Sequence, residues 1–448
     1  MRFFPLTDSD REDMKKEIGI SDIKELFSDL PEKNSYFPLD DIPHLLEENE
    51  LIAKFDEIGK KNSFKEYLSF LGGGAYNHFI PEVVNYLSNR GEFVTPYTPY
   101  QPEVSQGSLQ AIFEYQTMIS ILTGLDVSNS SLYDGGTAAA EGLLLAIRKT
   151  RKNKILVAKN IHPEYFEIIK TYTQNLEISI EEIEYDQISG KTDIEDLKKK
   201  VDENTAGLLF QSPNFFGIVE DSSDLSDIIH KSGGLSVQVI SEAFSLPFLT
   251  SPGDNQVDIA VGEAQSFGLP LSFGGPYLGF MAARKELVRQ MPGRLVGETV
   301  DSKGRRGYVL TLSTREQHIK REKATSNICS NQAWCALRAA IFLSVLGKDG
   351  MMKISKSNHL NAAYFKKLVS NFEKIKIKFS GEFFNEIVIE LTDIDVTEFL
   401  DKMKNNKILA GIPLKWFFKN MKNSILINFT ELHSKSDIEK FAKLIGEL

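Results

Sequence analysis

The pattern of apolar and polar positions divides the chain into three segments, of which the first is residues 1–65. Apolar residues there recur at helical spacing, as in the stretch SDIKELFSDLP. The residues on this helical face are Ile23, Leu26, Phe27 and Leu30. Ser21 is a suitable N-cap for the helix, and Pro31 lies just beyond its end. Because the segment has too little apolar surface for a core of its own, we predict an N-terminal helical arm that packs on another surface.

The second segment, residues 66–330, alternates short apolar runs with helical stretches. The runs read KILVAK, TAGLLFQ, LSVQVIS, VDIAVG and LGFMAA. Apolar runs of this length, separated by room for a helix, are typical of a mostly parallel sheet with helices on both faces. We therefore predict a large α/β domain.

The third segment, residues 331–448, opens with an alanine-rich helical stretch, NQAWCALRAAIFLSVLG. Three β-type runs follow, IKIKF, FFNEIVIEL and SILINF, with helical patterns around 396–403 and 436–444. This order of elements predicts a smaller C-terminal α+β domain of about a hundred residues.

The composition is that of a folded globular protein, with 42% hydrophobic and 25% charged residues among 448. A net charge of -10 disfavours nucleic acid as a partner. No apolar run has the length of a membrane helix, and the start MRFFPLTDSDREDM lacks the pattern of a secretory signal. The two cysteines, Cys329 and Cys335, match no zinc-site spacing, so we expect reduced thiols, no metal site and a cytoplasmic location.

A glycine run, Gly72–Gly74, lies in the stretch LGGGAYNHFIPEVV. It is not followed by Lys and Ser or Thr, which excludes a Walker phosphate loop. Two interpretations stay open: a turn that needs positive φ, or a loop beside a binding cleft.

A proline-rich segment follows, in which Tyr97 and Tyr100 alternate with Pro96, Pro99 and Pro102. The prolines exclude a helix or a central strand and stiffen the chain. The segment ends at Ser105, before a predicted helix that contains Leu109, Ile112 and Phe113. Rigid tyrosines are favoured where two surfaces meet, although simple packing accounts for the same residues.

Small residues precede another alanine-rich helix in the stretch SLYDGGTAAAEG. Gly135, Gly136 and Thr137 at a helix N-terminus suit a phosphate group, because free amides and the positive end of the helix dipole both favour an anion. A glycine turn with a threonine N-cap has the same pattern, so the motif alone does not decide.

Taken together, five stretches resemble the P-protein family of the glycine cleavage system, in its subunit 1 form. They are FLGGGAYNHFIPEVV, YTPYQPEVSQGSLQAIFEYQTMI, SLYDGGTAAAEG, GEAQSFGLPLSFGGPYLGF and PGRLVGETVDSKGRRGYVLTLSTREQHIKREKATSNICSNQ. The resemblance runs along the whole chain. It implies a type I fold of pyridoxal-phosphate (PLP) enzymes and the activity of a glycine dehydrogenase (aminomethyl-transferring, decarboxylating).

The resemblance also directs attention to the residues that such a cofactor needs: a lysine for the imine and an acidic residue near the pyridine nitrogen. Gln265 occupies the position of the lysine, and an amide cannot form the imine. Glu242 is the nearest counterpart of the acidic residue, and with Gly135, Gly136 and Thr137 it makes up a vestigial cofactor site. Lys323 lies in a distinctive motif, REKATSN, but within a charged run typical of surface ion pairs.

From the resemblance we expect a heteromer in which a homologous, lysine-bearing subunit carries PLP, with two copies of each subunit. Its substrates are glycine and the lipoyl arm of H-protein. Residues of this chain then line the partner's active site: Tyr97, Thr98, Tyr100, Gln101, Glu103, Thr325, Ser326 and Asn327. Two alternatives stay open, a purely structural or regulatory subunit and a self-sufficient PLP enzyme that uses another lysine.

Overall fold

The structure is a computed structural model that describes residues 6–29, 45–326, 328 and 331–447. Its contacts divide the chain into two compact units, Met1–Lys65 and Glu66–Leu448. No helix among these described residues is long and apolar enough to cross a membrane.

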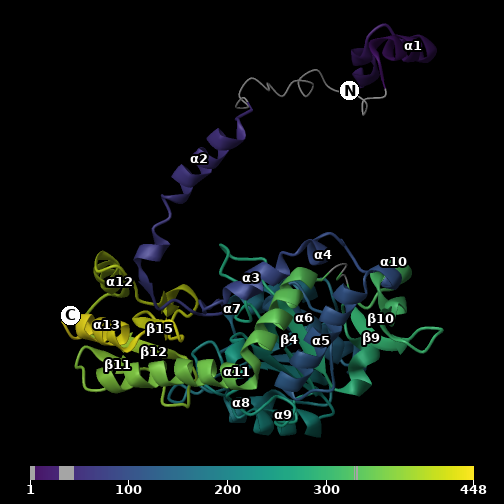
Figure 1. The fold of residues 1–448 in the computed structure, drawn as a ribbon. Helices are drawn as coiled ribbons and strands as arrows, with labels where there is room; N and C mark the ends of the chain where they lie inside the picture. The colour runs from purple at the N-terminus through teal and green to yellow at the C-terminus, as the bar shows by residue number, and fades with distance from the viewer. Residues whose placement is uncertain (1–5, 30–44, 327, 329–330, 448) are drawn as a thin grey trace. The chain divides into compact units, whose positions relative to one another are not determined.

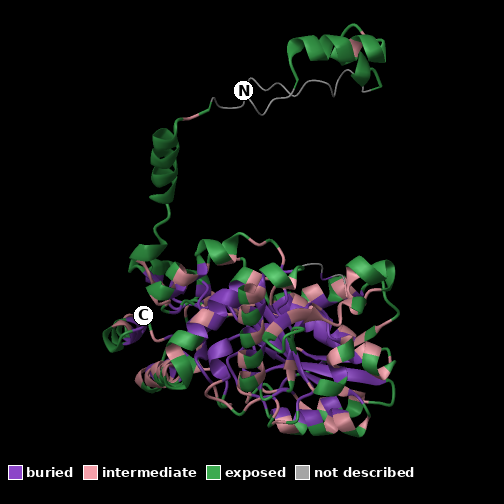
Figure 2. Ribbon diagram, turned by 45° about the vertical axis from the view of Figure 1, so that its right-hand side comes forward, coloured by how far each residue is buried: buried purple, intermediate pink, exposed green. Residues whose placement is uncertain are grey.

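The first unit contains α1 (Asp8–Ile18), a 3-10 helix η1 (Ile23–Phe27) and α2 (Glu48–Gly59). The prediction of a helix from Ser21 to Leu30 is wrong in two respects: the segment forms a 3-10 helix, and its N-cap is not Ser21. Asp22 is the N-cap, because its carboxylate accepts the Lys24 amide, and the helix ends after five residues as a 3-10 turn. Its apolar residues are exposed, as are those of α2, which Figure 2 shows in green. Leu30 and Pro31 lie outside the described residues.

The second unit is built on a seven-stranded sheet, whose strand order is β2-β8-β7-β6-β5-β3-β4. The strands are β2 (Val127–Ser128), β3 (Lys154–Ala158), β4 (Ser179–Ile183), β5 (Thr205–Gln211), β6 (Leu235–Ile240), β7 (Ile259–Glu263) and β8 (Gly279–Ala283). Strands β3 to β7 are parallel to one another, whereas β8 is antiparallel to β7 and β2. The prediction of a mostly parallel α/β sheet is therefore confirmed, with β8 as its antiparallel member.

Apolar residues on both faces of this sheet are buried (Figure 2). Val261 on β7 packs in a cluster with the helix α6 (Gly135–Thr150), while its neighbour Ala260 packs in a second cluster with α5 (Gln106–Thr123). Adjacent residues of a strand point to opposite faces, so a continuous apolar run is what a sheet covered on both sides requires. Further helices of this part are α3 (Glu82–Ser88), α4 (Gly91–Val94), α7 (Pro163–Thr173), α8 (Ile194–Lys200) and α9 (Ser222–Lys231).

The long helix α11 (Ala333–Val369) connects this sheet to a smaller one, as Figure 1 shows. Its residue Phe342 packs with the large sheet and Phe365 with the small one, on either side of a non-helical Gly347. The small sheet has the order β11-β12-β15-β14. The elements of this part are β11 (Ile375–Ile377), β12 (Glu386–Leu391), α12 (Val396–Asn405), β14 (Ile412–Pro413), β15 (Ser424–Asn428) and α13 (Lys435–Gly446). The domain boundary at residues 330 and 331 stays a prediction.

Two short strand pairings and one helix complete the strands and α-helices of the described residues. Strands β9 (Leu295–Val300) and β10 (Arg306–Thr311) form an antiparallel ribbon. Strand β1 (Leu68–Ser69) pairs in parallel with β13 (Ile408–Leu409), so the chain just before the glycine run is attached to the C-terminal part. Helix α10 (Gln317–Lys320) follows the ribbon.

Candidate functional site

The candidate site lies where the parallel strands end. His162 follows β3, Glu242 follows β6 and Gln265 follows β7, so the carboxyl ends of three strands bring these side chains to one edge of the sheet. Open α/β sheets bind their ligands at this edge. A cavity of about 440 Å³ lies here, and Gly135 and Gly136 are part of its lining.

The glycine loop, residues 71–80, crosses this edge. Gly73 and Gly74 have φ of 70° and 110° and line the cavity, so both interpretations of the glycine run apply, a turn with positive φ and a loop beside a cavity. The Gly73 carbonyl accepts a hydrogen bond from His162 at 2.8 Å. Burial lowers the pKa of His162 to about 4, so this ring is neutral and donates from one nitrogen.

Gln265, at the position that the resemblance gives to the lysine, has its side chain fully engaged. Its Oε1 accepts from the Tyr76 amide at 3.0 Å, while its Nε2 donates to the carbonyls of Tyr76 at 3.0 Å and Leu269 at 2.7 Å. The residue is only 1% exposed. A side chain that both accepts and donates is needed here, and an ammonium group offers donors only. Gln265 therefore attaches the glycine loop to the sheet.

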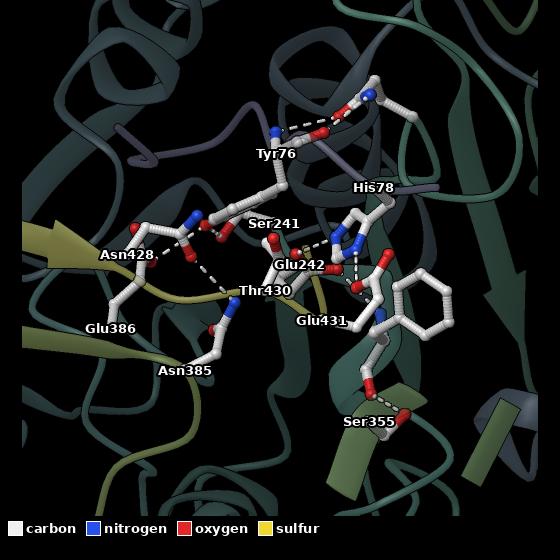
Figure 3. A network of polar contacts seen from close by, with 12 residues as sticks. Tyr76, His78, Ser241, Glu242, Ser355, Asn385, Glu386, Asn428, Thr430 and Glu431 are labelled. Carbon is white, nitrogen blue, oxygen red and sulfur yellow. Dashed lines mark hydrogen bonds and ion pairs between the residues drawn. The ribbon is translucent and has the colours of Figure 1, made fainter. Parts of the chain in front are cut away.

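Glu242 is equally buried, and its partner is another residue of the glycine loop. His78 Nε2 lies 3.1 Å from Glu242 Oε2, and His78 Nδ1 lies 2.8 Å from Glu431 Oε2 (Figure 3). Burial by itself lowers the pKa of His78, but the charge and hydrogen bond of Glu242, followed by those of Glu431, raise it to about 9. His78 is therefore an imidazolium held between two carboxylates.

A third glutamate, Glu386 on β12, holds the same loop. It accepts from the Gly73 amide at 2.7 Å and from the Tyr76 hydroxyl at 2.9 Å. Burial, with a smaller effect of the charge of Glu242, raises the pKa of this carboxyl to about 7 against the opposing effect of the two donors. The loop is thus bound by three glutamates and one glutamine from distant parts of the chain.

The predicted phosphate motif at the start of α6 has partners inside the chain. Asp134, not Thr137, is the N-cap, and its carboxylate accepts the Thr137 amide at 2.7 Å. The Gly135 amide donates to Glu263 at 3.0 Å. A side chain at Gly136 would meet the flexible end of Ile168, which would have to shift to make room for it. The vestigial phosphate cradle stays a prediction, but two of its amides already donate to carboxylates.

Glu263, the last residue of β7, is the carboxylate that accepts the Gly135 amide. It also accepts from the amides of Leu278 at 2.8 Å and Gln265 at 3.0 Å. Burial raises its pKa to about 7 in spite of these donors. An anionic ligand at the start of α6 would face Glu263 and Asp134, which repel it when ionised.

The residues predicted to line a partner's active site lie in two segments of the chain. Tyr97 is 95% exposed, whereas the Tyr100 hydroxyl accepts from Arg294 at 3.2 Å. Ser326 donates to Glu141 on α6, and the Thr325 amide donates to the Arg315 carbonyl at 3.1 Å. Gln101 and Glu103 are exposed and Thr98 is partly exposed, while Asn327 lies outside the described residues.

Sequence reasoning missed the residues that meet in this site: Tyr76, His78, Glu263, Glu386 and Glu431. The only local signal was a histidine inside the glycine-rich motif. Its partners Glu242 and Glu431 lie 164 and 353 residues further along the chain, a separation that no motif spans.

Comparison with known proteins identifies the family. The family model "Glycine cleavage system P-protein" matches residues 1–445. A relative from Koribacter versatilis, named "Probable glycine dehydrogenase (decarboxylating) subunit 1", is 46% identical over 450 residues, covering 100% of both chains. The chain belongs to the glycine cleavage system P-protein family. Another P-protein relative with the same name, from Geobacillus, is 45% identical over 448 residues, covering 100% of this chain and 99% of its own.

Solved structures agree with this P-protein assignment. A crystal structure of glycine decarboxylase (P-protein) of the glycine cleavage system, in inhibitor-bound form, superposes with a TM-score of 0.88 at 38% identity, covering 100% of both chains. A NifS-like protein shares the fold at a TM-score of 0.63 and 14% identity, covering 85% of this chain and 98% of its own. The predicted type I fold of PLP enzymes is confirmed.

The residues of this P-protein chain do not fit PLP at its own site. Gln265 offers no amine, and its amide is already bonded to the glycine loop. The Glu242 carboxylate is paired with His78, and the amide of Gly135 with Glu263.

Proposed function

We propose that this chain is the subunit of a heteromeric glycine decarboxylase that lacks the cofactor lysine. PLP is held by a homologous, lysine-bearing subunit, which releases CO₂ from glycine and transfers the aminomethyl group to the lipoyl arm of H-protein. The observation that carries this proposal is the family match along the whole chain together with glutamine at position 265. We expect two copies of each subunit in a cytoplasmic complex.

In this proposal the segment from Tyr97 to Glu103 faces the partner's cofactor pocket, together with residues 325–327. Tyr97 is almost fully exposed, so a neighbouring chain can bury its ring and use its hydroxyl. Tyr100 is held more firmly, because Arg294 donates to its hydroxyl and lies with Cζ 5.3 Å from the ring centroid. A tyrosine fixed in this way can orient a substrate group at little further cost in entropy.

The N-terminal arm supports the same proposal. On α2, Leu51, Ile52, Phe55 and Ile58 recur at helical spacing and are between 44% and 64% exposed. An isolated helix of this length is marginal in water, and an exposed apolar stripe is stabilised when another surface covers it. We assign that surface to the lysine-bearing subunit, because the proposed heteromer already places that subunit against this chain.

The test is to combine the purified chain with its lysine-bearing homologue and lipoylated H-protein. We expect exchange between labelled CO₂ and glycine only when all three are present. A lysine-to-alanine variant of the homologue should abolish exchange, whereas Gln265→Ala in this chain should leave part of it. Exchange by this chain without the homologue would overturn the proposal in favour of a self-sufficient PLP enzyme. Undiminished exchange by the homologue without this chain would favour a structural or regulatory subunit.

A further inference from the structure

The glycine loop is bonded to the side chains of Glu242 and Gln265. These are the positions assigned to the partner of the PLP ring and to the cofactor lysine. We propose that residues 73–79 block this site against PLP. His78 pairs with the Glu242 carboxylate, and the main chain of Tyr76 is hydrogen-bonded to the side chain at position 265. The chain then excludes the cofactor even when a lysine is restored at 265. The inference rests on the positions assigned to Gln265 and Glu242 in the proposed function, and not on the partner or on activity.

Glu242 already has a buried cationic partner, His78. His78 and Glu242 are each 2% exposed in their side chains, and Glu431 is 14% exposed. Oε2 of Glu242 faces the buried imidazolium of His78, and Oε1 accepts the Phe244 amide at 2.9 Å. Neither oxygen is left for a second cation such as a pyridinium. The His78 ring also packs against Phe244, with centroids 4.6 Å apart, which fixes its position beside Glu242.

The side chain of Gln265 is paired with the main chain of Tyr76. A single amide satisfies both the N–H and the C=O of one residue, so the loop gains two hydrogen bonds from one side chain. Lysine at 265 could donate to the Tyr76 carbonyl but would leave its N–H without an acceptor. The substitution therefore weakens the loop's attachment without removing the loop.

The glycine loop is also held by Glu386 and Glu431, independently of Gln265. Glu386 accepts from Gly73 and Tyr76, and Glu431 accepts from the Phe79 amide at 2.8 Å. These bonds come from the C-terminal part of the chain and do not involve Gln265; Figure 3 shows the one between Glu386 and Tyr76. Lysine at position 265 thus faces a loop that is still held in place, and releasing Glu242 requires a change at His78.

The experiment uses the full chain with PLP and borohydride, and mass spectrometry of the peptide that contains position 265. We expect Gln265→Lys alone to carry no more pyridoxyl label there than background. Adding His78→Asn should increase the label roughly tenfold or more, because a carboxylate free to pair with the ring nitrogen favours its charged form. Equal labelling of the single and double variants, or no label in a folded double variant, would overturn the proposal.

The matched control is His433→Asn combined with Gln265→Lys. His433 is also buried, and its ring bonds to Ser69, just before the glycine loop, and to Thr430. We expect this variant to stay unlabelled. Labelling equal to that of the His78 variant would mean that any loosening admits PLP, which overturns the proposal.

A second measurement needs no variant and applies if the double variant does not fold. Nitrogen NMR of the histidine-labelled chain at about pH 8, where an ordinary histidine is neutral, should show one imidazolium with both nitrogens protonated. Neutral rings for all seven histidines would overturn the proposal, because Glu242 would then lack its internal cation.

Discussion

Gln265 bonds to the main chain of Tyr76 through both ends of its amide, at 3.0 Å each, across 189 residues of sequence. Gln265, to which the proposed function gives the position of the cofactor lysine, thus also joins the glycine loop to the sheet. Substitution at this position should therefore affect folding as well as chemistry.

We predict that Gln265→Leu lowers the free energy of unfolding by about 2–4 kcal/mol, since it leaves the buried N–H and C=O of Tyr76 without partners. The midpoint of urea unfolding measures this change. Gln110→Leu is the matched control, because Gln110 is exposed and bonds only across one helical turn to Glu114. Its midpoint should stay close to that of the wild type. A loss for Gln265→Leu no larger than for the control would contradict the structural role of this amide.

The protonated state of His78 predicts a dependence of stability on pH. The pKa rises from 6.5 in the unfolded chain to about 9 in the fold, so the stabilisation is complete below pH 6.5 and is lost as pH rises through 9. The groups that face the ring are the carboxylates of Glu242 and Glu431 and the Phe244 ring.

The test compares the wild type with His78→Gln at several pH values. The wild type should lose on the order of 3 kcal/mol relative to the variant between pH 6.5 and pH 9. The free energy of unfolding from urea titrations measures the difference. Parallel curves over this range would show that His78 does not bind a proton on folding.

The raised pKa of Glu386 predicts a second dependence of stability on pH, at lower pH than that of His78. Burial raises its pKa from 4.5 to about 7, so the fold favours the protonated carboxyl, and stability is lost as pH rises from 4.5 to 7. In Glu386→Gln the amide can still accept from Gly73 and donate to the Tyr76 hydroxyl. We expect this variant to lose less stability than the wild type between pH 4.5 and pH 7, as measured by thermal unfolding. The same slope for both chains would count against a protonated Glu386.

The tyrosines of the proline-rich segment allow assembly and catalysis to be separated. Tyr97→Phe and Tyr100→Phe keep the ring area, so the complex with the lysine-bearing subunit should still assemble in gel filtration. Each should raise the barrier to CO₂ exchange by about 1–3 kcal/mol through loss of a positioned hydroxyl. Unchanged exchange in both variants would place the segment outside the active site. Dissociation of the complex would make it an interface element only.

Much of this protein follows from local sequence. The strands β3, β5, β6 and β7 were predictable because a strand buried on both faces needs a continuous apolar run. The presence of an alanine-rich helix in SLYDGGTAAAEG and the identity of residue 265 were also readable from short motifs, although the N-cap of that helix is Asp134 and not Thr137. The prediction around Ser21 was wrong because several residues there can cap a helix, and local pattern does not choose among them.

Only the tertiary structure decided what this edge of the sheet does. No local motif marks His78, Glu242 or Glu431, which lie in three distant segments. Their contacts depend on how the small sheet packs beside the large one. Their protonation depends on the same packing, because burial and neighbouring charges set a pKa and neither is encoded locally. The sequence by itself determined that the chain lacks a lysine at position 265. The fold decided that Gln265 and Glu242 are bonded to the chain's own glycine loop, because hydrogen bonds between distant segments exist only after folding.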